Sequence, residues 1–120
     1  MTQVEHVDFV SVLTQDLARA KRFYEDVLGL AVETEGESDM EFRLGQVTLD
    51  VFDPSSIGQP FAPSPAGIAL RVPDVDVARS ELEAKGVVFD GETIETSVCR
   101  QAWFKDPDGN ALMLHRRFDV

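Results

Sequence analysis

The chain has 120 residues, of which 22 are acidic and 11 are Lys or Arg, so its formal net charge at pH 7 is −11. Such a charge disfavours nucleic acid and anionic membranes as partners, because both require basic surfaces. No apolar run approaches the roughly 20 residues of a membrane span, and the first residues do not resemble a signal peptide. The single cysteine excludes an internal disulfide and indicates a cytoplasmic protein. The length indicates one domain, 1–120.

The first half of the chain is expected to contain one helix and four strands. The β-like run at 7–13 precedes Asp16, whose side chain suits a helix N-cap. Apolar residues then recur at helical spacing as far as Gly29, which can end a helix. Three further strands are predicted at 30–34, 40–45 and 47–53.

The second half repeats this order. A strand at 68–72 precedes Asp74, a second N-cap, and a helix that ends at Gly86. Three strands are then predicted at about 87–89, 97–105 and 111–117. A doubled order of strand, helix and three strands predicts an α+β fold built from two βαβββ repeats. The repeats span about 5–53 and 66–117, joined by a linker at 54–65 that holds four of the six prolines.

Three segments resemble the vicinal oxygen chelate superfamily, also called the glyoxalase/bleomycin-resistance/dioxygenase superfamily. They are DLARAKRFYEDVLGL at 16–30, GIALRVPDVDVARSELEAKGVVF at 67–89 and FKDPDGNALMLH at 104–115. The resemblance implies that the two repeats form a cupped, partly open barrel around a cleft, and that the chain is a homodimer. The superfamily includes lactoylglutathione lyases, ring-cleaving dioxygenases, epimerases, fosfomycin-modifying transferases and metal-free drug-binding proteins, so the fold alone does not specify the activity.

The positions that hold a divalent metal in the enzymes of this superfamily are mostly unsuitable here. The resemblance places them at Phe9, Asp50, Gly67 and Met113. Phenylalanine and glycine offer no side-chain ligand, and a thioether suits soft ions rather than the ions that these enzymes use. One carboxylate among four positions predicts that the protein holds no metal and needs no cofactor.

Strand periodicity predicts which side chains line the cleft instead. Residues that share a face with Phe9, Asp50 and Met113 include both hydrogen-bonding and apolar groups. For the strand that enters the DPDG turn, the inward assignment follows the resemblance to the fosfomycin enzymes. The predicted ligand-binding residues are Phe9, Ser11, Arg43, Asp50, Arg71, Cys99, Gln101, Trp103, Met113 and His115.

A purely structural interpretation remains open at this point. Arg43 and Asp50 could pair with each other, and Trp103 could be a core residue. Cys99 could be a nucleophile beside His115 or simply a buried thiol. Two inward arginines favour ligand binding, because a structural core does not favour unpaired charges.

Two functional interpretations follow. The first is a metal-independent small-molecule-binding protein that sequesters a drug or a metabolite, with a mostly apolar site and a few polar groups. The second is an enzyme of the lyase or isomerase type with an atypical or metal-free site, using His115, Asp50 or Cys99 as acid or base. The sequence does not identify catalytic residues beyond these candidates.

Overall fold

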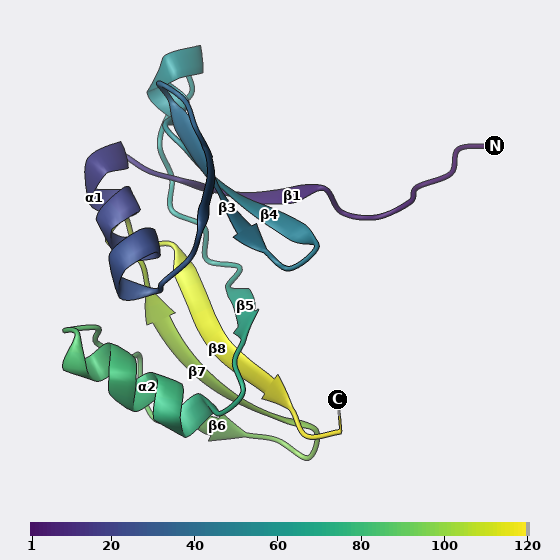
Figure 1. Cartoon of the computed structure of the whole chain (residues 1–120), viewed down its shortest axis with the longest axis vertical. Helices are drawn as coiled ribbons and strands as arrows, with labels where there is room; N and C mark the ends of the chain where they lie inside the picture. The colour runs from purple at the N-terminus through teal and green to yellow at the C-terminus, as the bar shows by residue number, and fades with distance from the viewer. Residues whose placement is uncertain (120) are drawn as a thin grey trace. The chain divides into compact units, whose positions relative to one another are not determined.

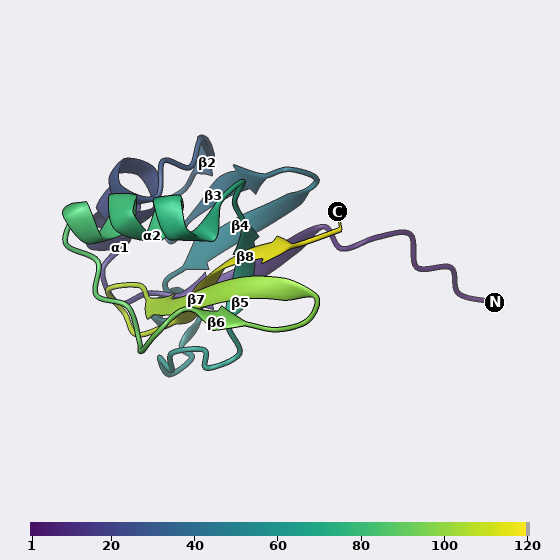
Figure 2. The same ribbon diagram turned by 90° about the horizontal axis from the view of Figure 1, so that it is seen from below.

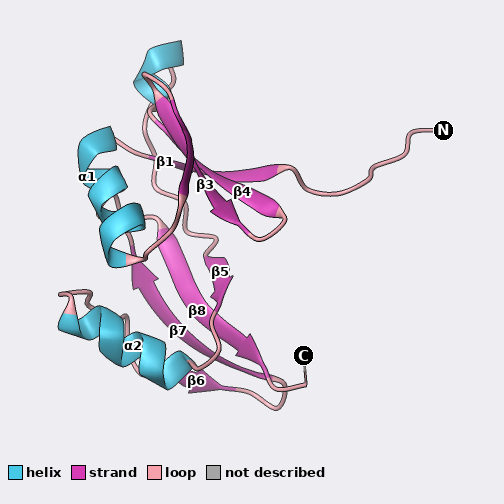
Figure 3. Cartoon of the chain, viewed as in Figure 1, coloured by secondary structure: helices cyan, strands magenta, loops and turns pink. Residues whose placement is uncertain are grey.

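The computed structural model describes residues 1–119, which divide into two compact units (Figure 1). The first unit is Met1–Ala62 and the second begins at Pro63. Each unit holds an open four-stranded mixed sheet and a helical segment (Figure 3), so the fold is α+β as predicted. Within residues 1–119, no helix combines the length and apolar character needed to cross a membrane.

The first unit has the element order β-α-β-β-β with short additions. Its strands are arranged β1-β4-β3-β2, with β1 parallel to β4 and the other pairs antiparallel. A 3-10 helix lies inside the segment that the sequence predicted to be a linker. The elements are β1 (Phe9–Leu13), α1 (Leu17–Lys21), the π-helix η1 (Arg22–Val27), β2 (Val32–Glu35), β3 (Asp39–Leu44), β4 (Val47–Phe52) and the 3-10 helix η2 (Pro54–Ile57).

The second unit repeats this order. Its strands are arranged β5-β8-β7-β6, again with one parallel pair, β5 and β8. The helix lies beside the sheet and contacts β7 and β8 (Figures 1 and 2). The elements are β5 (Ile68–Arg71), α2 (Val75–Ala84), β6 (Ile94–Glu95), β7 (Cys99–Lys105) and β8 (Ala111–Arg117).

Both predicted N-caps are present. Asp16 accepts a hydrogen bond from the backbone N–H of Arg19, and Asp74 accepts one from Val77, each at 3.0 Å. These bonds satisfy backbone donors that have no partner inside the first helical turn. The helices therefore begin where the sequence indicates.

Alternating side chains separate each sheet into a helix-facing side and an opposite side. In the first unit Tyr24 packs on Phe42, with ring centroids 5.6 Å apart, and Leu49 and Val51 are fully buried. The residues between them along β3 and β4 are more exposed. In the second unit the alternating residues Ala102, Phe104, Leu112 and Leu114 are buried. The period of two places the remaining side chains on the opposite face of each sheet.

The prediction of a strand at 87–89 was wrong. Only Phe89 forms an isolated bridge, to Phe104, and the short strand β6 lies further along the chain. Arg79 of α2 explains the difference. Its guanidinium lies 4.8 Å from the centre of the Phe89 ring and donates hydrogen bonds to the Gly91 carbonyl and the Thr93 hydroxyl. Contacts with the helix therefore hold this segment, in place of a continuous strand ladder.

The turn between β7 and β8 contains a buried polar network. The Asp106 carboxylate accepts hydrogen bonds from the backbone N–H groups of Asp108 and Asn110 and from the Asn110 side-chain amide. The Asn110 side-chain oxygen in turn accepts from the backbone N–H of Ser64 at 2.8 Å. Asn110 therefore joins the turn to the segment that leads into β5.

Replacing Asn110 by Ala should destabilise the protein by about 2–3 kcal/mol, because it removes a hydrogen bond to a buried carboxylate and leaves the Ser64 N–H without its acceptor. Urea unfolding followed by circular dichroism measures this loss. Asp74→Ala, which removes an exposed N-cap, is the comparison and should cost about 1 kcal/mol. An Asn110→Ala variant that is no less stable than Asp74→Ala would contradict the role given to the turn.

Candidate functional site

The face of the first sheet opposite its helix is named the Asp50 face. Asp50 on β4 lies in register with Ser11 on β1 and with Glu41 on β3, so the three side chains are neighbours on one face. The adjacent register pairs add Phe9, Thr48 and Arg43 on one side, and Asp39, Phe52 and Leu13 on the other. The Asp50 face thus consists of Phe9, Ser11, Leu13, Asp39, Glu41, Arg43, Thr48, Asp50 and Phe52.

Asp50 has an unusual electrostatic environment. The Ser11 hydroxyl donates to Asp50 Oδ2 at 3.2 Å, while Asp50 Oδ1 is buried and has no hydrogen-bond partner among residues 1–119. Burial, followed by the nearby carboxyl of Asp39 and the charge of Glu41, raises the pKa of Asp50 to about 6. The hydrogen bond from Ser11 acts in the opposite direction. Asp50 is therefore able to exchange a proton near neutral pH.

Arg43 does not pair with Asp50. Its guanidinium forms an ion pair with Glu33 at 2.6 Å, and Glu33 also accepts a weaker hydrogen bond from the Thr48 hydroxyl at 3.4 Å. The Arg43–Asp50 alternative left open by the sequence is therefore not what the structure contains.

Phe9 is 55% exposed and so is not a core residue.

The corresponding face of the second sheet is named the Trp103 face. Two rows of side chains cross it. One row runs Ala69, Met113, Trp103 and the next runs Arg71, His115, Gln101, each set in register on β5, β8 and β7. An apolar row therefore lies directly beside a row of hydrogen-bonding groups. The Trp103 face consists of Ala69, Arg71, Gln101, Trp103, Met113 and His115.

The Trp103 ring lies against the backbone of Gly67. A Cβ atom at Gly67 would lie 2.3 Å from Cζ3 and 2.6 Å from Cη2 of the indole. Gly67 also has φ +77°, a conformation that other residues rarely adopt. The indole N–H donates to the Gln101 side-chain oxygen at 2.6 Å. Trp103 is therefore fixed at one end by a hydrogen bond and at the other by a contact that only glycine permits.

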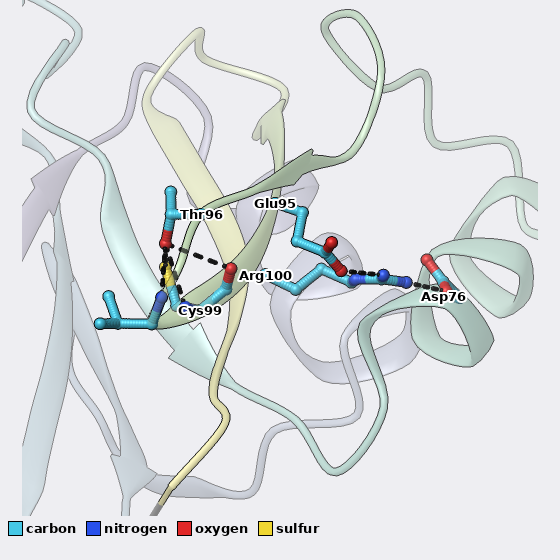
Figure 4. Close-up of polar contacts among 6 residues, drawn as sticks. Asp76, Glu95, Thr96, Cys99 and Arg100 are labelled. Atoms are coloured by element: carbon cyan, nitrogen blue, oxygen red, sulfur yellow. Dashed lines mark hydrogen bonds and ion pairs between the residues drawn. The ribbon is translucent and has the colours of Figure 1, made fainter.

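Cys99 is buried, with 6% of its surface exposed. Its sulfur lies 3.3 Å from the Thr96 hydroxyl and 3.8 Å from the Gln101 amide nitrogen. Figure 4 shows Thr96 beside Cys99, and Arg100 next to them paired with Asp76 and Glu95. Cys99 is in register with Arg117, whereas the register partner of His115 is Gln101. The structure therefore fits the buried-thiol interpretation of Cys99 better than the nucleophile interpretation.

The predicted metal positions do not form a suitable ligand set. Phe9 and Met113 bring no hard donor, and the space that a side chain at Gly67 would enter is taken by the Trp103 ring. Within residues 1–119, no group of three or more His, Cys, Asp or Glu is arranged to hold a metal ion. The residues present do not fit the divalent ion of the enzymes in the resembled superfamily.

Comparison with known proteins agrees with the architecture of these two units. The sequence profile of the Glyoxalase/Bleomycin resistance protein/Dioxygenase superfamily matches residues 4–114. The chain belongs to this superfamily. The curated protein YaeR of Escherichia coli (strain K12) is 29% identical over 132 residues, covering 98% of this chain and all of YaeR.

Solved structures show the same fold. TnmS3, described as an antibiotic binding protein from Streptomyces sp. CB03234, is 29% identical, with a TM-score of 0.80 and coverage of 98% of this chain and 99% of that chain. A lactoylglutathione lyase from Agrobacterium tumefaciens also has a TM-score of 0.80, over 94% of each chain, but its 21% identity carries information about the fold alone.

Some features of the two faces were not predicted. Asp39 lies two residues before Glu41 on β3, so strand alternation would have placed its carboxyl group on the same face as Glu41 and Asp50. The pairing of Glu33 with Arg43 depends on a register shift between Val32 and Thr34, which the sequence does not reveal. The supporting role of Gly67 depends on the indole orientation, which strand periodicity does not determine.

The raised pKa of Asp50 predicts how stability depends on pH. The folded chain holds this proton more tightly, with a pKa of about 6, than the unfolded chain, whose ordinary value is 3.8. Below about pH 4 Asp50 is protonated in both states, so its raised pKa does not affect stability. As pH rises through about 6 the folded state is increasingly destabilised, because ionising Asp50 costs more free energy there than in the unfolded chain. Asp50→Asn keeps a neutral side chain and should remove this loss.

Urea unfolding at about pH 4.5 and 7.5 provides the measurement, and the stability gained by Asp50→Asn should be larger at the higher pH. Asp26→Asn makes the same chemical change at an exposed position of η1, outside the carboxyl cluster. Equal pH dependence of the gain in the two variants would contradict the elevated pKa of Asp50.

Proposed function

We propose that the protein binds a small molecule without a metal ion, and that the Trp103 face is its main binding surface. The contact between Trp103 and Gly67 carries this proposal. A glycine at a position where metal enzymes of the superfamily place a ligand leaves room for a flat aromatic ring, which is held in place by Gln101. A fixed, partly exposed aromatic surface beside hydrogen-bonding groups is typical of a small-molecule site.

The relatives support a binding role. TnmS3, whose name describes it as an antibiotic binding protein, is 29% identical over nearly the whole chain. Sequestration of a drug or a metabolite is therefore the form of activity that we propose. In this proposal Phe9, Ser11, Arg43 and Asp50 form a second binding surface on the Asp50 face, and Cys99 contacts the Gln101 amide beside Trp103.

The raised pKa of Asp50 favours a second candidate, a metal-free enzyme of the lyase or isomerase type. A carboxyl that titrates near pH 6 is suited to accept and return a proton at neutral pH. Incorporation of solvent deuterium into small α-hydroxy carbonyl compounds, lost in Asp50→Asn, would distinguish this candidate from a binding protein. Lactoylglutathione lyase activity is not expected, since the metal positions are unsuitable.

We also propose that the protein is a cytoplasmic homodimer that does not bind nucleic acid, and that its two units function together as one domain. The superfamily resemblance supports the dimer, and the net charge of −11 supports the absence of nucleic-acid binding. Light scattering at micromolar concentration should give twice the 13.3 kDa mass of the chain. A species of 13.3 kDa alone would contradict the dimer.

Metal independence has a direct test. After dialysis against a chelator, the protein should contain no stoichiometric divalent ion and should keep both its melting temperature and its affinity for any ligand found by thermal-shift screening. A bound ligand at 100 times its Kd stabilises the fold by about 2.7 kcal/mol, which such a screen detects. A stoichiometric metal that survives dialysis, or affinity that returns only when metal is added, would overturn the proposal.

Gly67→Ala should weaken ligand binding, because the added methyl displaces the Trp103 ring. Quenching of the fluorescence of Trp103, the only tryptophan, reports the binding. Gly86→Ala is the matched control, since Gly86 also has a positive φ, +93°, but a Cβ there meets nothing within 4 Å. Both variants carry the backbone strain, and only Gly67→Ala should lose affinity. Equal affinity in the two variants would place the ligand away from Trp103.

A further inference from the structure

Gln101 lies in the polar row of the Trp103 face, with apolar groups on two sides of it. Trp103 follows it on the same face of β7, and its register partners are His115 on β8 and Ile94 on β6. Gln101 and Trp103 are half-buried, and Ile94 is 48% exposed. Hydrogen bonds formed beside apolar groups are stronger than those formed in bulk water. Gln101 is therefore placed to select a ligand by its hydrogen-bonding groups.

The indole of Trp103 fixes the orientation of the Gln101 amide. An indole nitrogen can only donate a hydrogen bond, so the atom that it contacts at 2.6 Å is the amide oxygen, Oε1. The amide nitrogen, Nε2, donates a long hydrogen bond of 3.8 Å to the Cys99 sulfur. Two partners, one at each end of the amide, therefore define the same orientation.

In this orientation the donor side of the amide is the less satisfied one. Nε2 carries two hydrogens, and within residues 1–119 the Cys99 sulfur is the acceptor that it contacts. The oxygen already accepts a short hydrogen bond from Trp103. A ligand against this amide therefore gains most by presenting a hydrogen-bond acceptor to the second N–H of Nε2.

The amide lies at the edge of the Trp103 ring. Oε1 contacts the indole N–H, and Nε2 belongs to the same amide, so both are beside the ring. Met113 is in register with Trp103 and extends the apolar surface next to it. A flat ligand stacked on the indole would reach Nε2 with an acceptor on its own edge, such as a ring carbonyl. Stacking and one hydrogen bond would then hold the ligand without an ion pair.

We propose that the Trp103 face selects uncharged planar aromatic ligands with a hydrogen-bond acceptor on the ring edge, and that Gln101 is the residue that determines this specificity. The inference rests on the proposed binding function and adds the chemical class of its ligand. Trp103 supplies the stacking surface and Gln101 Nε2 supplies the donor. Because this selection involves no ion pair, salt should leave it unchanged.

The experiment uses three uncharged probes with one bicyclic frame. The probe 1-indanone carries a carbonyl acceptor, indole carries an N–H donor, and indene carries neither and reports stacking alone. NMR titration of isotope-labelled protein gives each Kd from the Trp103 indole N–H resonance, which is unique because the chain has one tryptophan. The ratio of the indole Kd to the indanone Kd defines the acceptor preference. Comparing this ratio between variants cancels the different hydrophobicities of the probes.

Three variants assign the preference to Gln101. Gln101→Met removes both hydrogen-bonding groups, so the acceptor preference should fall by about 2- to 10-fold, as expected for the loss of one hydrogen bond. Gln101→Glu keeps an oxygen for the Trp103 N–H and replaces Nε2 by an acceptor, so the preference should fall below that of Gln101→Met. Gln46→Glu makes the same charge change at an exposed turn between β3 and β4 and should keep the wild-type preference.

A measurement on the unaltered protein tests the same contact without relying on a variant that folds. The side-chain NH₂ resonances of Gln101 are identified by their nuclear Overhauser effect with the Trp103 indole N–H. Saturation with indanone should move one of them downfield, because its hydrogen gains an acceptor. Indene should move it less, since it brings no acceptor.

The outcomes separate the ligand class from the binding function. If both Gln101 variants keep the wild-type acceptor preference, or if indanone leaves the Gln101 NH₂ resonances in place, the ligand class is wrong. The binding function still stands in that case, provided that the probes shift the Trp103 indole resonance saturably. If no probe shifts that resonance and the Trp103 fluorescence is inaccessible to quenchers, the binding function fails and the ligand class fails with it.

Discussion

The contact between the Trp103 ring and the backbone of Gly67 is the constraint on which the candidate site depends. It requires a residue without Cβ and with φ +77° at position 67. It also requires the segment before β5 to be held in place, which the turn between β7 and β8 achieves. Ser64 donates to the Asn110 side chain and its carbonyl accepts from the Ala111 N–H. A buried structural turn therefore determines where a half-buried aromatic ring can lie.

The two units have the same element order but opposite chemistry on equivalent rows. Ser11, Asp50 and Glu41 form one row in the first sheet, and Ala69, Met113 and Trp103 form the corresponding row in the second. Burial, followed by the neighbouring carboxyl groups of Asp39 and Glu41, raises the pKa of Asp50, because ionising it there costs free energy. The second row has no such cost, since its contacts are apolar. The repeat therefore conserves the backbone pattern, while the side chains on each face differ in chemistry.

Local signals in the sequence were sufficient for most of the fold. Asp16 and Asp74 marked the helix starts, and the alternation along β3 and β4 assigned the side chains to the correct faces. Where the prediction failed, a contact distant in sequence decided the structure. Arg79 holds the segment after α2 through Phe89, and a register shift in β2 brings Glu33 to Arg43. Neither contact has a periodic pattern that the sequence could reveal.

Position 67 connects the structural argument to the functional one. A metal ligand there needs a side chain, whose Cβ would lie 2.3 Å from the Trp103 ring and would have to displace it. A side chain is also strained at φ +77°, so the backbone itself would have to change. Supporting Trp103 and supplying a metal ligand are therefore mutually exclusive uses of this position. Introducing a metal ligand at position 67 would require changes at that position, at Trp103 and in the backbone together, because each depends on the others.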